Sequence, residues 1–229
     1  MRQTIPWAVA TIIGLSTTAP AGADDYFVTI FTAESVPFRP TKTHAFASIV
    51  RAPCGPDGKP GALEVHAICW GPASMKVRGV TLRAEEGANL TLPETLEWCR
   101  AECLRVSVWG PYRVKCELYE KLKEQSELLS SGKIKYKSTD TFVPRCVAMN
   151  CYHALTHPVA PLRRHSGAFN AGDAAGSLVL RVYNPWLIEP CTTHDPILSV
   201  IGADKYDLVR RSFGYRPGRV DAIRSAVGR

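Results

Sequence analysis

The sequence predicts an α+β fold, in which helices pack on an antiparallel sheet. Two observations support this fold class. Segments rich in β-branched and aromatic residues dominate the first half of the chain, and segments with a helical spacing of apolar residues occur throughout. The length of 229 residues fits one domain of ordinary size, with or without small appendages.

The N-terminal residues have the pattern of an export signal. Arg2 precedes the largely apolar stretch Ile5 to Leu15, and Ala21-Gly22-Ala23 offers a small-residue cleavage site. The apolar stretch is shorter than the roughly 20 residues that span a bilayer, although an uncleaved anchor is the alternative. We therefore expect residues 1–23 to be a signal peptide. Residues 24–229 would then form one domain with a C-terminal extension, in the periplasm or outside the cell, without a stable membrane span.

The chain has a formal net charge of +7. Residues 1–23 contain one arginine and no acidic residue, so their removal would leave +6. This surplus would favour anionic surfaces such as cell-wall polymers or acidic lipid headgroups, or simply solubility. The basic residues do not alternate with aromatic ones in one segment, and no zinc finger or Gly-rich phosphate loop is present. We expect no nucleic-acid partner.

Eight cysteines follow the predicted signal peptide, which favours disulfides in an exported protein. If Cys151 is a free thiol, at least one other cysteine must also be unpaired. Cys69 fits that description, because it lies within the apolar stretch Val65 to Trp70. The other six allow 15 connectivities. Cys99 and Cys103 could share a helix face, but no nearby His or second Cys pair completes a zinc set, so we expect neither a metal nor a cofactor.

The first half of the chain predicts a hairpin. Residues 24–40 are expected to be an irregular or edge segment, and Thr43 to Arg51 a strand. The turn formers from Cys54 to Gly61 predict a loop, and Leu63 to Trp70 the returning strand. Alternation places His44 with Phe46, Ser48 and Val50, and His66 with Glu64, Ile68 and Trp70. We expect the hairpin to set His44 and His66 on the same side of the sheet.

The rest of the chain alternates between helical and extended patterns. Helices are predicted from Leu92 to near Cys103, over Glu117–Leu129 and over 145–156, with short ones at Pro196–Ile201 and Tyr206–Arg211. Strands are predicted at Leu104–Trp109, Lys133–Lys137 and Leu178–Tyr183, with a loop at 163–176.

The segment Asn150-Cys151-Tyr152-His153-Ala154-Leu155 is the most informative of the chain. A Cys after a polar residue and before an apolar run is typical of the first turn of a buried helix. There the helix dipole lowers the pKa of a thiol and favours the nucleophilic thiolate. His44, at the start of a strand about a hundred residues earlier, is a candidate to take the thiol proton.

This segment is similar to the Asn-Cys-Glu-His-Phe-Val nucleophile motif of the lecithin:retinol acyltransferase family, with Tyr in place of Glu and Ala-Leu in place of Phe-Val. That family belongs to the circularly permuted branch of the NlpC-type, papain-like cysteine peptidase superfamily. His44, His66 and Cys151 match the order of the family's site residues. Elsewhere, the chain resembles uncharacterised exported bacterial proteins in three segments: Thr43 to Val50, Glu64-Val65-His66 and Trp109-Gly110-Pro111-Tyr112.

The resemblance implies a permuted papain-like thiol hydrolase or acyltransferase. Cys151 would attack an amide or ester, His44 would move the proton, and His66 (or Glu64) would orient the His44 ring. Peptide or cell-wall amide bonds would be the substrates, with lipid acyl chains second. The alternative is a non-catalytic, disulfide-stapled exported domain that binds a cell-wall or surface polymer. In it, Cys151 would be half of a structural disulfide, with Cys146 or Cys191. The sequence does not indicate an oligomeric state.

Overall fold

The computed structural model describes residues 23–39, 41–55, 61–78, 83–138, 148–161 and 172–217. Nearly all of the predicted signal peptide, Cys146, most of the predicted 163–176 loop and the end of the C-terminal extension lie outside these residues. The predicted cleavage and the predicted extension therefore stay predictions.

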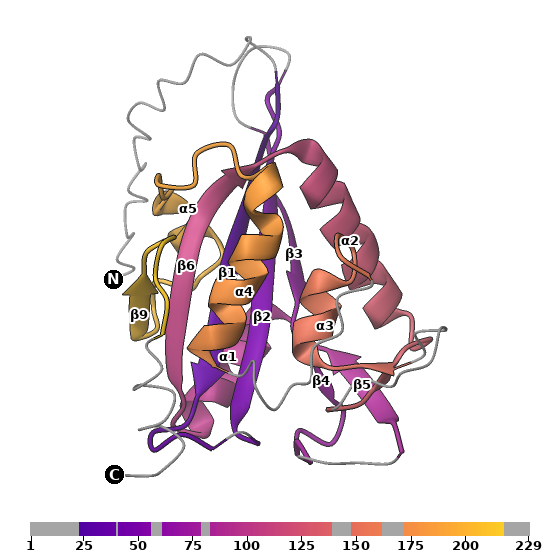
Figure 1. Ribbon diagram of the computed structural model, residues 1–229. Helices are drawn as coiled ribbons and strands as arrows, with labels where there is room; N and C mark the ends of the chain where they lie inside the picture. The colour runs from indigo at the N-terminus through magenta and orange to yellow at the C-terminus, as the bar shows by residue number, and fades with distance from the viewer. Residues whose placement is uncertain are drawn as a thin grey trace, which may run out of the picture.

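A five-stranded sheet forms the centre of the fold, in the order β3-β2-β1-β6-β9 (Figure 1). Its strands are β1 (Asp25–Glu34), β2 (Thr43–Ala52), β3 (Glu64–Ile68), β6 (Arg105–Val114) and β9 (Leu208–Arg211). All neighbours are antiparallel except β6 and β9, which are parallel. A smaller sheet, β4-β5-β7-β8, consists of β4 (Trp70–Pro72), β5 (Glu85–Asn89), β7 (Lys135–Tyr136) and β8 (Ala148–Met149). The fold is α+β, which confirms the predicted class.

Helices cover both faces of the central sheet (Figure 1). The α3 face carries α2 (Cys116–Ser130), α3 (Cys151–Thr156) and α4 (Asp173–Tyr183), which is followed by a single 3-10 turn, η1 (Asn184–Trp186). The α1 face carries α1 (Leu92–Ala101) and α5 (Pro196–Val200). Alternation along β2 divides its side chains between two cores, because Ala45, Ala47 and Ile49 join the α3 face whereas Phe46 and Val50 join the α1 face.

Helices α1 and α2, which lie over opposite faces, were predicted from their sequences. α1 begins with a capping box, in which Thr91 and Glu94 satisfy each other's backbone N–H groups. α2 buries Leu118, Leu122 and Leu129 along one stripe. The β2 to β3 hairpin and the short α5 are also confirmed.

Three predicted elements are wrong. Residues 25–34 form a central strand rather than an irregular segment, because both faces of β1 are buried. Residues 178–183 belong to helix α4 rather than to a strand, since their apolar side chains face the sheet with helical spacing. Residues 208–211 form strand β9 rather than a helix, beside the distant β6. β6 also runs through Gly110-Pro111 to Val114 instead of ending there.

Within the part of the chain that the structure describes, no helix has both the length and the apolar character needed to cross a membrane.

Candidate functional site

Cys151 is the first residue of α3, as the sequence predicted. Asn150 caps the helix, since its side-chain oxygen accepts a hydrogen bond of 2.7 Å from the backbone N–H of His153. The lead-in strand is held by the indole N–H of Trp70, which donates to the Met149 carbonyl at 3.0 Å. Cys151 is half-buried against the core of the α3 face. Its backbone is therefore fixed on both sides of the thiol.

His44 lies on the other side of the central sheet. Its ring stacks on Phe46 at 5.2 Å between centroids and meets the edge of Trp98 at 5.9 Å, both on the α1 face. The structure therefore does not bring His44 to Cys151, and the predicted dyad needs correction. A backbone sheet separates the two side chains, so no local adjustment of rotamers joins them.

His66 is also misplaced in the predicted triad. β2 and β3 pair Ile49 with His66, so His66 points to the α3 face while His44, five residues before Ile49, points to the α1 face. The expectation that the two histidines share a side is wrong. His66 is instead hydrogen-bonded to Glu64 at 2.9 Å, and Lys123 donates to the same carboxylate at 2.7 Å. Hydrogen bonds from Lys123, then His66, lower the pKa of Glu64 to about 2.

A small cavity on the α1 face contains the His44 ring. It holds about one water-sized sphere, about 20 Å³, and its lining includes His44, Cys69, Met75, Thr95 and Trp98. Burial lowers the pKa of His44 to about 4 and raises the pKa of Cys69 to about 12. A protonated thiol beside a neutral imidazole, in a space too small for a substrate carbonyl, is not an activated nucleophile.

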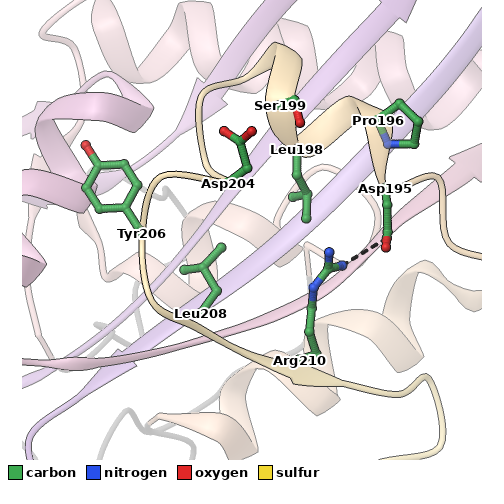
Figure 2. A pocket seen from close by; sticks show the side chains of 8 residues that line it. All are labelled: Asp195, Pro196, Leu198, Ser199, Asp204, Tyr206, Leu208 and Arg210. Atoms are coloured by element: carbon green, nitrogen blue, oxygen red, sulfur yellow. Dashed lines mark hydrogen bonds and ion pairs between the residues drawn. The ribbon is translucent and has the colours of Figure 1, made fainter. Parts of the chain in front are cut away.

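A second, open hollow lies where α5 and β9 meet (Figure 2). Its volume is about 400 Å³. Polar side chains surround it and two leucines line it: Asp195, Ser199, Asp204, Tyr206, Arg210, Leu198 and Leu208. Arg210 donates to Asp195 at 3.0 Å, and the Tyr206 hydroxyl donates to Glu97 at 2.8 Å. Asp204 is exposed and makes no side-chain hydrogen bond or ion pair with the rest of the described chain.

Sequence reasoning missed this hollow because it assigned residues 206–211 to a helix. In a strand, Leu208 and Arg210 share a side, whereas in a helix they would diverge. The segment Leu208-Val209-Arg210-Arg211 has no alternation of apolar and polar residues, so its sequence carries no clear strand signal that could have found the hollow.

A buried ionic cluster joins β1, β6, β9 and α4. Glu34 pairs with Arg105, and Asp173 accepts from Arg211 at 2.6 Å and from the Thr32 hydroxyl at 2.9 Å. Burial, together with the nearby Asp173 charge, raises the pKa of Glu34. Each carboxylate has an arginine partner, so the cluster is a satisfied structural network.

The seven described cysteines form no disulfide with one another. Among those same residues, no three His, Cys, Asp or Glu side chains gather as a metal site would require. Comparisons of this chain with protein-family models, with curated proteins and with solved structures find no match.

Proposed function

We propose that this protein is an exported domain that binds a polysaccharide carrying amino groups, in the hollow between α5 and β9. The observation that carries the proposal is the set of side chains around that hollow, which combines free acceptors with a fixed donor and apolar contacts. Its volume of about 400 Å³ suits a small-ligand or single-sugar subsite.

The charges around the hollow favour an amine-bearing sugar. Arg210 is already paired with Asp195, so the unpaired Asp204 leaves a local negative charge. A protonated amine would satisfy Asp204, and sugar hydroxyls would exchange hydrogen bonds with Asp195, Ser199 and Arg210. Leu198 and Leu208 would contact the apolar face of the sugar ring.

The open shape also fits a polymer. The polar side chains of the hollow are largely exposed, with side-chain exposures of 59% for Asp195 and 49% for Arg210. A chain of sugars can therefore enter and leave at either side. A binding domain of this kind needs no nucleophile, which agrees with the separation of His44 from Cys151.

A matched pair of oligosaccharides tests the proposal. Calorimetric titration with glucosamine hexamers and with their N-acetylated counterparts compares an amine with an amide on one backbone. We expect the glucosamine hexamer to bind more tightly, and Asp204→Asn to weaken it about 10-fold, or about 1.4 kcal/mol. Asp207→Asn, an exposed neighbour outside the hollow, is the control and should bind like the wild type. Equal binding by all three proteins, or none, would remove the proposal.

Thiol-dependent acyl transfer at Cys151 is the second candidate. It is favoured by the capped start of α3, where the helix backbone presents its N–H groups to the thiol. His44 is not its base, so another group would have to take the proton. Alkylation with iodoacetamide at pH 6, followed by peptide mass analysis, tests this reading. Selective labelling of Cys151 in the native protein supports it, and a disulfide-linked Cys151 peptide from non-reduced protein refutes it.

A further inference from the structure

The cavity on the α1 face buries an imidazole that has no polar partner. His44 is 9% exposed, its ring makes only stacking contacts with Phe46 and Trp98, and no hydrogen bond or ion pair joins that ring to the rest of the described chain. Buried polar groups are hydrogen-bonded in the great majority of proteins, so an unpartnered imidazole that lines a cavity indicates a ligand for it.

Two sulfur-containing residues are among those that line the same cavity. Cys69 supplies a thiol from the end of β3, and Met75 supplies a thioether from the turn after β4. The backbone at Met75 has a φ of 56°, which is uncommon for a residue other than glycine. A hydrogen bond of 2.9 Å from the Met75 N–H to the Pro72 carbonyl holds this turn. Uncommon backbone conformations of this kind cluster at ligand sites.

We propose that the His44–Cys69–Met75 cavity binds one Cu(I) ion. Thiolate and thioether sulfurs are soft ligands that select Cu(I), and imidazole nitrogen is a good third ligand. The cavity volume of about 20 Å³ accommodates a single ion or a water molecule and no larger ligand.

Charge balance favours a monovalent ion. Binding releases the Cys69 proton to solvent and forms one sulfur–copper bond, so the thiolate and Cu(I) together are neutral. A neutral unit suits the apolar walls that Val77, Leu90 and Trp98 provide. Zn²⁺ with the same ligands would leave one uncompensated buried charge. It would also lack the third Cys, His or carboxylate that zinc sites use, since the described residues bring no such group together.

The sequence predicted no metal site because the three donors are far apart along the chain and one of them is a methionine. The fold brings them together through the β2 to β3 pairing, which sets Phe46 opposite Cys69 by extension of the observed register and places His44 diagonally to it. No short sequence motif contains all three residues, so a motif search would not predict such a site.

Copper titration of the reduced protein tests the proposal. Other cysteines would also bind Cu(I), so the measurement uses a background in which Cys54, Cys103, Cys116, Cys146, Cys151 and Cys191 are serines. Anaerobic titration against a chromogenic Cu(I) chelator should show one tightly bound ion per chain, and X-ray absorption should show both sulfur and nitrogen neighbours. Cys69→Ser should abolish this binding.

Met75→Leu keeps the test informative if Cys69→Ser fails to fold, because Met75 is only half-buried. We expect it to weaken Cu(I) binding at least about 10-fold, a loss comparable to that from disturbing a metal site's supporting residues. Met149→Leu removes a fully buried thioether on the α3 face and should leave the affinity unchanged. The proposal is overturned if Met75→Leu and Met149→Leu bind equally, or if Cys69 is found in a disulfide, such as one with the neighbouring buried Cys99, in the native non-reduced protein.

Discussion

The α3 face and the α1 face of the central sheet bury polar side chains in different ways. On the α3 face, the buried Glu34 and Asp173 and the half-buried Glu64 each meet a cationic partner, and the Asn150 amide both caps α3 and donates to a loop carbonyl. On the α1 face, by contrast, the buried His44 ring has only aromatic contacts, beside the thiol of Cys69. The charged groups of the α3 face are therefore paired within the chain, although the Trp109 indole N–H and the Tyr112 and Tyr119 hydroxyls on that face have no hydrogen-bond partner among the described residues. The His44 ring on the α1 face has neither an ionic nor a hydrogen-bonding partner there.

This difference distinguishes polar side chains that are paired within the fold from polar side chains that a ligand could pair. A buried charge is tolerated only when an opposite charge of the same fold pairs with it. Removing one partner leaves the other charge buried and uncompensated, which destabilises the fold. A buried neutral polar group without a partner lowers the stability of the fold by its desolvation penalty, and a ligand that bonds to the group removes that penalty. The paired charges of the α3 face therefore do not mark a binding site, and the proposed copper site lies instead at His44 on the α1 face.

The largest expected effect on the free energy of unfolding comes from removing Asp173 from the buried ionic cluster on the α3 face. Asp173→Ala leaves Arg211 and the Thr32 hydroxyl without their acceptor at a side chain that is 5% exposed. We expect a loss of about 3 kcal/mol in the free energy of unfolding, at the low end for a broken buried pair because the arginines reach solvent. Urea denaturation measures it. Asp207→Ala, on the surface, should change stability by less than about 0.5 kcal/mol. A similar value for both variants would mean that the network contributes nothing.

The second expected effect is a dependence of the free energy of unfolding on pH, which arises from His44 on the α1 face. Burial holds the pKa of His44 at about 4 in the folded chain, whereas an exposed histidine titrates near 6.5. The unfolded chain therefore takes up the proton at higher pH, so stability is fully present above about pH 6.5 and is lost as the pH falls toward 4. The difference corresponds to about 3 kcal/mol at most. In His44→Phe, which keeps the stacking on Phe46, the His44 part of this loss should disappear, whereas the part due to His194, whose pKa burial also lowers, should remain.

The α3 face provides the control for that pH window. The pKa of Glu64 is lowered to about 2, so its contribution is present above about pH 4.5 and is lost only as the pH falls from there toward 2. Glu64→Gln should flatten the stability profile below pH 4.5 and leave the window from 6.5 to 4.5 unchanged. If His44→Phe and the wild type lose stability in parallel down to pH 4, the histidine is not buried as described.

A third prediction concerns how closely α4 approaches the sheet on the α3 face. A Cβ added at Gly176 would lie 2.6 Å from the Trp109 ring, which is fully buried. Alanine normally stabilises a helix interior by up to about 1 kcal/mol relative to glycine, but the clash costs about 1–3 kcal/mol. We expect Gly176→Ala to be destabilising by about 1 kcal/mol in urea denaturation. A stabilised variant would show that α4 can move away from the sheet without cost.

The contrast between the faces also explains what the sequence could predict. The β2 alternation and a helix with Cys151 in its first turn follow from local patterns, and both are confirmed. The helix predicted over 145–156 is nevertheless too long, because residues 148–149 form strand β8. The side of the sheet that His66 takes depends on hairpin register, and a shift of one residue reverses it. Neither the composition of the loop after Cys54 nor its length determines that register. β9 was unpredictable for a different reason, since its partner β6 lies about a hundred residues earlier.

The last comparison concerns the caps of two helices on opposite faces, and it includes the smallest expected effect, that of Thr91→Ala. Asn150 is 3% exposed, and its side chain accepts from His153 and donates to the Ser138 carbonyl, so Asn150→Ala leaves two backbone groups unsatisfied in a buried place. We expect a loss of about 1–2 kcal/mol for it. Thr91→Ala, at the exposed start of α1, should cost about 0.5–1 kcal/mol, because water replaces its hydroxyl. Thermal unfolding of the two variants measures both. If Thr91→Ala is the more costly, the buried cap of α3 is not rigid, and the backbone at Cys151 is not held as the α3 face implies.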